Sequence, residues 1–516
     1  MTKMIGKSVK RVEDKRFITG KGQYTDDIVL PNMAYAQFVR SPYAHAKIIS
    51  IDTAEALAHP GVIAIYTGAD VAEVNGVPCG WQVNFKNGDT MKEPKHPLLV
   101  VNKARHAGDA VAVVIAESRE IARDAVDLVE VDYEELEAVV DPKQAAEAGA
   151  PLVHEDAPNN ICFDWELGNP KEEVDAAIAG SAHVTTLEFA NQRVAPNAIE
   201  PRSYIGDYDV AHDKYTLYTS TQNPHLIRLL LCAFVLGIPE HKVRVVSKDV
   251  GGGFGSKIFH YSEEALVTWI TKDIGRPVKW TAERSEAFLT DAHGRDHVTK
   301  AEMGFDTDGN ITGLRIKTYA AMGGYLSTFA PAVPTYLHGT LLQGLYTTPK
   351  IHIDVVATFT HTCAVDAYRG AGRPEATYLL ERMLDTAALE MGRDPAELRL
   401  QNFIPAFNGV DEEGYVTNVA LQYDSGNYHP VLHRALEMVG YEDFRKEQAA
   451  ARENGKLLGI GFSTYIEACG IAPSAVVGAL GARAGLFEVS QVRVQPTGKV
   501  SVYTGAHSHG QGHETT

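Results

Sequence analysis

Three glycine-rich segments of this 516-residue sequence could hold an anionic ligand, at residues 251–257, 369–372 and 510–512. Glycine lets backbone N–H groups approach a phosphate closely, and a helix that begins after such a loop adds a favourable dipole. Taken singly, each segment is equally typical of an ordinary turn. The first matches neither a Walker A loop nor a dinucleotide-binding loop, because Ser256 replaces a glycine that each motif requires.

A fourth segment has part of the pattern of a calcium-binding loop. Asp306, Asp308 and Asn310 have the spacing of the first oxygen ligands. However, Ile311 replaces the required glycine and Lys317 the closing glutamate. We therefore predict a hairpin turn here.

The histidines near residue 510 and one charged tripeptide could also belong to a site. His507, His509 and His513 resemble a metal cluster, but their spacing around a loop favours a role in hydrogen bonding. Residues 200–202, Glu-Pro-Arg, fit either a salt-bridged turn or the wall of a site, and the sequence leaves this choice open.

Composition excludes several classes of protein. The 48 basic and 66 acidic residues give a formal charge of −18, which argues against nucleic acid or an anionic membrane as a partner. The longest apolar run, residues 229–238, is too short to cross a bilayer, which takes about 20 residues. The five cysteines are scattered without a C-x-x-C pair, so we expect no iron–sulfur cluster or structural zinc on this chain and a reducing, cytoplasmic environment.

The elements that must position these segments form a mixed α and β pattern. Strands are expected at residues 36–39, 47–51, 62–67, 109–116, 129–133, 214–220 and 243–250. Helices are expected after Ser118, at 226–236, after the first glycine segment, from Pro374 and at 431–439, and a hairpin is expected around Gly498. A loop-rich stretch at 147–160 predicts the first domain boundary.

Several strings occur in an order that resembles the large subunit of the molybdenum hydroxylases, the family of xanthine dehydrogenase, aldehyde oxidase and aerobic carbon monoxide dehydrogenase. The resemblance spans essentially the whole chain and leans toward the carbon monoxide dehydrogenase-like members. The strings are RVED (11–14), GKGQYTDD (20–27), VRSPYAHA (39–46), VEVDYE (129–134), TQNPH (221–225), DVGGGFG (249–255), AYRG (367–370) and GQGHE (510–514).

The resemblance implies an α+β fold of three parts. These are an N-terminal α/β hammerhead-like domain at residues 1–145, a first molybdopterin-binding domain at 155–410, and the start of a second one at 430–516. In this family the dithiolene sulfurs of a pterin hold the molybdenum, so no side chain is expected to ligate the metal directly. By motif match, the cofactor-binding residues are Gln222, Gly253, Phe254, Gly255, Arg369 and Gly370 around the metal, and Gly510, Gln511 and Gly512 along the pterin.

The resemblance also suggests a substrate class. Ile258 stands where the xanthine-oxidising members have an acidic residue, and Ala371 where they have a phenylalanine. Arg295 matches an arginine that polarises the purine, but it lacks those partners. Gly370 stands where the copper-containing carbon monoxide enzymes have a cysteine, and Cys363 lies six residues before Arg369. An aldehyde or an N-heteroaromatic ring, hydroxylated with oxygen from water, is therefore the expected substrate.

The family's catalytic glutamate is expected beyond residue 516, and Glu514 does not take its role. We therefore expect a fragment or one half of a split subunit that is inactive alone. A non-catalytic protein that binds or stores the cofactor, or a partial domain without cofactor, is the alternative. The expected partners are an FAD-binding medium subunit and a [2Fe-2S] small subunit in a dimer of heterotrimers. The bacterial members that the chain resembles point to the cytosine dinucleotide form of the pterin.

Overall fold

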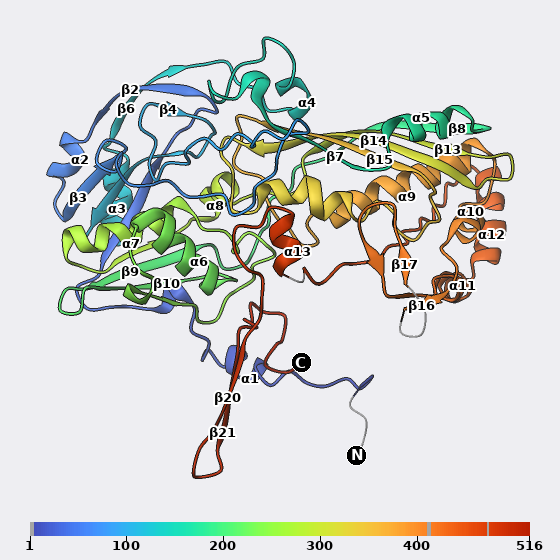
Figure 1. Cartoon of the computed structure of the whole chain (residues 1–516). Helices are drawn as coiled ribbons and strands as arrows, with labels where there is room; N and C mark the ends of the chain where they lie inside the picture. Colours follow the sequence, from blue (N-terminus) through green and yellow to red (C-terminus); the bar gives the residue numbers. More distant parts are fainter. Residues whose placement is uncertain (1–4, 410–413, 472–473) are drawn as a thin grey trace.

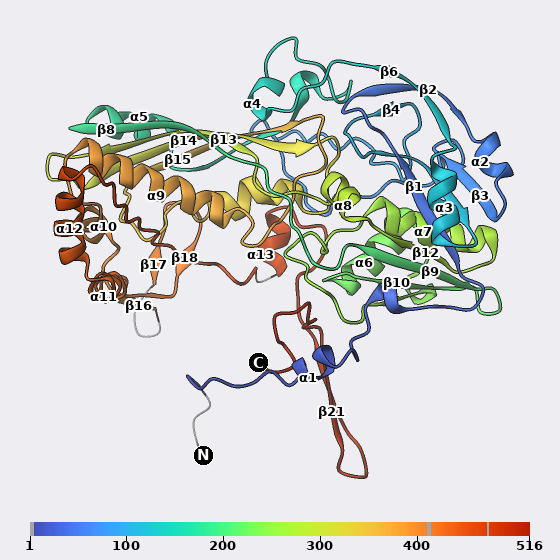
Figure 2. The same cartoon turned by 180° about the vertical axis from the view of Figure 1, so that it is seen from behind.

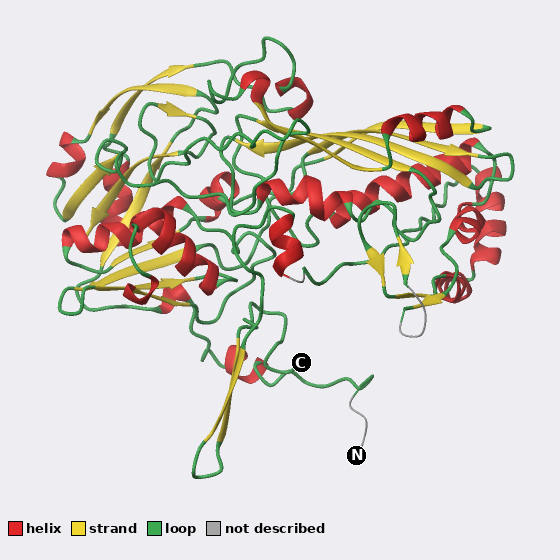
Figure 3. Ribbon diagram, viewed as in Figure 1, coloured by secondary structure: helices red, strands yellow, loops and turns green. Residues whose placement is uncertain are grey.

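Two large sheets organise the molecule, one toward each end of an elongated body (Figure 1). The computed structural model describes residues 5–409, 414–471 and 474–516. Strands and helices are interspersed along the chain, and Figure 3 shows both kinds of element packed together at each end of the body. The predicted α+β class is therefore confirmed.

A seven-stranded sheet joins residues from two of the expected domains. Its order is β11-β10-β9-β12-β1-β5-β3. The strands are β1 (Ala34–Arg40), β3 (Val62–Thr67), β5 (Ala110–Ala116), β9 (Ser203–Asp209), β10 (Lys214–Thr219), β11 (Val243–Val246) and β12 (Val278–Thr281). Because β1 pairs in parallel with β12 and antiparallel with β5, the sheet crosses the boundary expected near residue 150. Helix α7 (Ser262–Ile274) packs on β9 and buries Leu266 and Ile270 in the core of this sheet.

The remaining N-terminal elements cover this sheet. A small sheet has the order β4-β2-β6, formed by β2 (Ala46–Asp52), β4 (Lys103–Ala104) and β6 (Glu130–Glu135). Helices α2 (Ala54–Ala58) and α3 (Arg119–Val126) pack beside β3 and β5. Helix α3 begins at the predicted position because the Ser118 side chain accepts a hydrogen bond from Ile121 N at 3.2 Å.

A five-stranded sheet forms the other end of the body. Its order is β7-β15-β14-β13-β8, with β7 (Ile161–Gly168), β8 (His183–Asn191), β13 (His297–Phe305), β14 (Ile311–Gly323) and β15 (Ile351–Phe359). The predicted turn at Asp306 is confirmed, because its carboxylate accepts hydrogen bonds from the backbone of Asp308 and Asn310. The long helix α9 (Arg373–Glu390) runs along one face of this sheet and α5 (Lys171–Ala179) covers the other (Figure 1).

Shorter elements complete the chain. The helices are α1 (Asp14–Ile18), α4 (Pro142–Ala145), α6 (Pro224–Leu230), α8 (Arg284–Thr290), α10 (Pro395–Asn402), α11 (His429–Val439), α12 (Tyr441–Glu453) and α13 (Ser474–Ala479). Single turns are η1 (Thr25–Asp27), η2 (Pro158–Asn160), η3 (Leu231–Leu236), η4 (Glu240–Lys242), η5 (Ala330–Ala332) and η6 (Val333–Leu337). Two-residue strands are β16 (Phe407–Asn408), β17 (Tyr415–Val416), β18 (Gln422–Tyr423) and β19 (Ser425–Gly426).

The last hairpin, β20 (Ser490–Val494) and β21 (Val500–Thr504), projects from the body close to α1 in both views (Figures 1 and 2). It turns at Gly498, as predicted. No helix in the described part of the chain is both long and apolar enough to cross a bilayer.

The strand expected at residues 243–250 is too long. Strand β11 ends at Val246, because the next polar groups bond outside the sheet. The Ser247 hydroxyl donates to Thr221 O at 3.0 Å, and the Asp249 carboxylate accepts from Gln23 N at 2.7 Å. Residues 247–250 are thus part of the loop that leads into the first glycine segment.

Candidate functional site

Gln222 lies where two of the glycine-rich segments meet. Its Oε1 accepts a hydrogen bond from Gly255 N at 2.9 Å, and its Nε2 lies 3.3 Å from Nε2 of His509. Its backbone N–H donates to Lys257 O at 2.8 Å. The side chain is placed just before α6, whose first turn is capped by Asn223. One amide therefore contacts both the 251–257 loop and the segment that leads to residue 510.

The glycines of the first segment allow this approach. A Cβ on Gly253 would lie 2.3 Å from Oε1 of Gln222, and one on Gly255 would lie 2.2 Å from Ala367 O. Between them, Phe254 has a left-handed backbone with φ 54° and a side chain that is 40% exposed. Its carbonyl accepts a hydrogen bond from Arg369 N at 2.9 Å, so the first and second glycine segments interlock.

The third glycine segment is held by its own side chains. The Gln511 Oε1 accepts from His509 N at 2.7 Å, and Gln511 Nε2 lies 2.9 Å from Nε2 of His513. His507 Nε2 lies 3.0 Å from the Ser247 hydroxyl oxygen. The predicted hydrogen-bonding role of these histidines is therefore confirmed, and burial lowers the pKa of His507 and His509.

The N-terminal segment ties the first and third glycine segments together. Arg16 forms ion pairs with Asp249 and with Glu514, the latter at 2.6 Å. Beside it, the Thr515 hydroxyl donates to Glu13 Oε2 at 2.5 Å. Sequence reasoning missed this contact, because its members are more than 200 residues apart and no local pattern links them.

Glu200 and Lys257 form a buried ion pair under the first loop. Their Oε2 and Nζ atoms are 2.9 Å apart, and the same Oε2 accepts from Gly251 N at 2.7 Å. Burial lowers the pKa of Lys257, and the Glu200 charge opposes that effect. Of the two alternatives left open by the sequence, the ion pair of Glu200 is present, and its carboxylate also holds the first glycine segment through Gly251 N.

A network of buried charges lies behind this pair. The Arg202 side chain is 1% exposed and pairs with Glu263 at 3.0 Å and with Asp291 at 2.6 Å. Arg40, from β1, pairs with Glu263 at 2.8 Å and with Glu286 at 2.7 Å. Burial raises the pKa of Asp291, and Arg202 opposes that shift. The network joins β1 and α7, so it fixes the scaffold from which the first loop projects.

The three residues expected in a substrate pocket differ in their placement. Ile258 packs in an apolar cluster with Phe329, and Ala371 packs in a neighbouring cluster that shares Phe329. The guanidinium of Arg295 instead donates to the backbone carbonyl groups of residues 368 and 369. Their place in a substrate pocket stays a prediction, and the charge of Arg295 is directed at the protein backbone.

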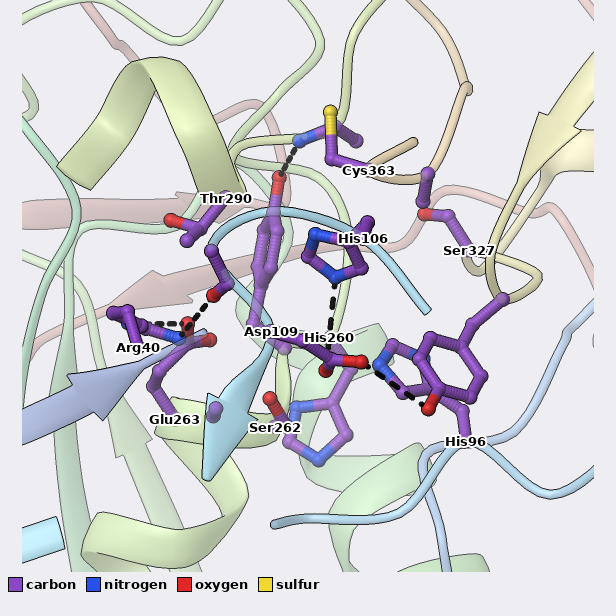
Figure 4. A pocket seen from close by; sticks show the side chains of 16 residues that line it. Arg40, His96, His106, Asp109, His260, Ser262, Glu263, Thr290, Ser327 and Cys363 are labelled. Carbon is purple, nitrogen blue, oxygen red and sulfur yellow. Dashed lines mark hydrogen bonds and ion pairs between the residues drawn. The ribbon is translucent and has the colours of Figure 1, made fainter. Parts of the chain in front are cut away.

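A partly open cavity of about 50 Å³ lies elsewhere, between the N-terminal region and residues 260–364 (Figure 4). His96, His106, Asp109 and His260 line it, together with Cys363. Figure 4 shows His106 and Asp109 pointing toward each other, with His106 Nε2 and Asp109 Oδ1 3.7 Å apart. None of the predicted cofactor residues lines this cavity, so it is separate from the junction of the glycine segments.

The groups gathered at the junction fit a phosphate-bearing, oxo-ligated cofactor. They are the amide of Gln222 and the backbone of the glycine segments, and Arg369, an exposed residue, is anchored there through its backbone N–H. The nearby carboxylates of Glu200 and Glu514 are paired with cations. No group of three or more His, Cys, Asp or Glu side chains among the described residues could hold a bare metal ion. Amide and N–H donors suit oxo ligands and phosphates without adding negative charge.

Comparisons with known proteins agree with this chemistry. Residues 19–137 match the aldehyde oxidase and xanthine dehydrogenase a/b hammerhead domain, and residues 153–403 and 434–516 match molybdopterin cofactor-binding domains. The chain is 36% identical over 527 residues to the carbon monoxide dehydrogenase large chain of Afipia carboxidovorans, covering 98% of this chain and 63% of that one. It is 30% identical over 451 residues to the nicotinate dehydrogenase large molybdopterin subunit of Eubacterium barkeri, covering 86% of this chain and 99% of that subunit.

A solved structure is similar throughout. Quinoline 2-oxidoreductase from Pseudomonas putida superposes with a TM-score of 0.91 at 35% identity, covering 100% of this chain and 64% of that one. The expected hammerhead and molybdopterin-binding folds are thereby confirmed. The chain spans about 63% of the length of the Afipia relative.

Proposed function

Because this chain belongs to the family of molybdopterin-binding large subunits of molybdenum hydroxylases, we propose that it holds a molybdenum–molybdopterin cofactor at the junction of its three glycine segments. The observation that carries the proposal is the position of Gln222. Its amide contacts Gly255 and His509, while Arg369 N bonds to Phe254 O. Three segments that are far apart in sequence thus meet through the Gln222 amide and backbone N–H groups.

Each segment has its own part in binding. Gln222, the loop of Gly253, Phe254 and Gly255, and the pair Arg369 and Gly370 would face the metal. Gly510, Gln511 and Gly512 would lie along the pterin, in its cytosine dinucleotide form. When bound, the cofactor supplies two-electron oxidation chemistry. The protein orients it with the Gln222 amide, backbone N–H groups and the Arg369 guanidinium, and keeps the charges of Glu200 and Glu514 paired.

We propose an aldehyde or an N-heteroaromatic ring as the substrate, hydroxylated with oxygen from water. The apolar side chains of Ile258 and Ala371 favour an aldehyde or a simple heteroaromatic ring over a purine as the substrate. A molybdenum–copper site is not proposed, because Gly370 follows Arg369 at the position where the copper-containing enzymes have a cysteine. Cys363 is buried and lines the separate cavity, and its Sγ lies 3.4 Å from Arg193 Nη1. Two relatives are named for the N-heteroaromatics quinoline and nicotinate.

We propose that the electrons leave through partner subunits. The cysteines are all free and four of them are buried, so none is arranged for an iron–sulfur cluster. We propose an FAD-binding medium subunit and a [2Fe-2S] small subunit as partners, in a dimer of heterotrimers. Buried free thiols also fit a reducing cytoplasm.

Product labelling tests this function. The protein is purified with its partner subunits and incubated in H₂¹⁸O with quinoline, nicotinate or benzaldehyde. Hydroxylated product that carries ¹⁸O from water supports the proposal. Product oxygen from O₂ would contradict it. Molybdenum bound in a complete assembly without turnover on any such substrate would instead favour a cofactor-binding or storage protein.

A further inference from the structure

Arg295 occupies a strained turn just before β13. Arg295 and Asp296 both have left-handed backbones, with φ of 69° and 66°. Non-glycine residues adopt this region at a cost, and such strain persists only where the surroundings enforce it. The turn is held on both sides, because Gly294 N donates to Val194 O at 2.9 Å and Asp296 N to Asn191 O at 3.0 Å.

The strained turn directs the Arg295 guanidinium at the second glycine segment. Its Nη1 donates to Tyr368 O at 2.7 Å and its Nη2 to Arg369 O at 3.0 Å. Its Cζ lies 5.1 Å from the centre of the Tyr368 ring. The side chain is only 12% exposed, and its hydrogen bond to Tyr368 O is partly buried.

The segment that receives these bonds needs outside support. Gly370, Ala371 and Gly372 have consecutive positive φ values of 98°, 35° and 78°. Three left-handed residues in a row form no regular element and have no helical or strand ladder to hold them. The carbonyl groups fixed by Arg295 lie directly before this stretch, where they set its direction.

A buried carboxylate depends on the same guanidinium. Glu375, in the first turn of α9, has a side chain that is 1% exposed and lies 3.5 Å from Arg295 Nη1. This is its only ion pair in the described ranges of the chain. Burial raises the pKa of Glu375, and the Arg295 charge opposes that rise. Removal of Arg295 would leave a buried carboxylate without its counter-ion.

We propose that Arg295 is a positioning residue, whose guanidinium fixes the carbonyl groups of Tyr368 and Arg369 and balances Glu375 so that the 369–372 loop keeps its shape. The effect of Arg295 on catalysis rests on the proposed function, which assigns Arg369 to the metal. In this proposal the Arg295 guanidinium supports the loop, whereas the family resemblance placed it in the substrate pocket.

Hydrogen exchange tests the proposal without requiring bound cofactor. The purified assembly is compared with its Arg295→Met variant, and exchange is followed in a peptide covering residues 366–374. We expect exchange there to become at least about tenfold faster, because local opening no longer breaks two charge-assisted hydrogen bonds. Arg393→Met is the matched control: Arg393 bonds to Asp308 O at the far end of the five-stranded sheet. It should leave that peptide unchanged.

A double variant keeps the test valid if Arg295→Met disturbs the whole fold. The double variant Arg295→Met with Glu375→Gln removes the unbalanced charge of Glu375 but does not restore the hydrogen bonds to the carbonyl groups of Tyr368 and Arg369. Strand β1 of the seven-stranded sheet reports on the rest of the fold. If exchange in β1 becomes fast in the single variant, we expect it to be slow again in the double variant, while exchange of residues 366–374 stays fast. Wild-type exchange of residues 366–374 in either variant would overturn the proposal.

Molybdenum content and steady-state kinetics add the catalytic readout. A positioning role predicts that Arg295→Met lowers molybdenum content or kcat by a similar factor for every substrate, with KM unchanged. Full molybdenum with KM raised for one substrate class would instead indicate a substrate contact and overturn the proposal. Absence of molybdenum from the wild-type assembly would refute the proposed function, whereas the exchange result would still decide the role of Arg295.

Discussion

At the scale of single residues, the site is built from contacts that hold neutral donors in place. Gln222 serves two glycine segments with one side chain, and Arg369 is anchored through its backbone while its side chain stays exposed. The charged groups around them are mostly paired. A cofactor with oxo ligands and phosphates can therefore be bound without burying an unpaired protein charge.

Arg369→Ala tests the most exposed of these donors. We expect molybdenum content or turnover to fall by roughly tenfold or more, because a hydrogen bond to a charged group contributes about 1.5–3 kcal/mol. Arg382→Ala, at an exposed position on α9, is the control. Metal analysis and turnover are measured on both. Full molybdenum and unchanged turnover in Arg369→Ala would remove this residue from the metal site.

Ile258 and Ala371 should make the enzyme a poor purine oxidase. A missing buried polar partner costs about 1–3 kcal/mol and a missing aromatic contact about 0.5–1.5 kcal/mol. The kcat/KM for xanthine should therefore be far below that for benzaldehyde or quinoline in the same preparation. Comparable values for xanthine and benzaldehyde would contradict the assignment of these two residues to the pocket.

At the scale of elements, local sequence patterns predicted most strands and helices, including the start of α3 at Ser118 and the turn at Asp306. They did not predict the pairing of β1 with β12, because partner choice between strands 240 residues apart has no local signature. The contacts of Arg16 with Asp249 and Glu514 escaped for the same reason. The identities of Gln222 and Arg369 came from a family resemblance, since neither residue stands out by spacing alone.

Gly253→Ala tests the interlocking of the loops. The added Cβ would lie 2.3 Å from Gln222 Oε1, so the amide or the loop must move. We expect overpacking to lower the free energy of unfolding by about 1–3 kcal/mol and to reduce molybdenum content. Gly461→Ala is the control, because no atom lies within 4 Å of its Cβ position. Urea denaturation and metal analysis compare the two, and equal results would argue against a close approach at Gly253.

At the scale of the whole molecule, several buried histidines are held in the neutral form. Burial lowers the pKa of His154 and His338 to about 4 and that of His361 to about 3. All three side chains lie between elements that are far apart in sequence. The stability of the fold should therefore respond to mild acid.

The sign follows from proton linkage. Below an ordinary histidine pKa of about 6.5, these histidines bind protons in the unfolded chain but stay neutral in the folded protein. The free energy of unfolding therefore falls as pH decreases. Between pH 6.5 and 5 it should fall by at least about 1.4 kcal/mol per pH unit, the limiting slope for one such histidine. Urea denaturation measures this slope, which should be smaller in His361→Gln. A constant free energy of unfolding over this range would show that these histidines are protonated in the folded state.

The molybdenum content of the purified assembly tests the central claim most directly. Metal analysis should find about one molybdenum per copy of this chain. The same analysis should find much less in Gln222→Leu, which keeps the size of the side chain but loses the amide that joins two glycine segments. Absence of molybdenum from a wild-type assembly whose flavin and iron sites are full would contradict the account, as would full molybdenum in Gln222→Leu.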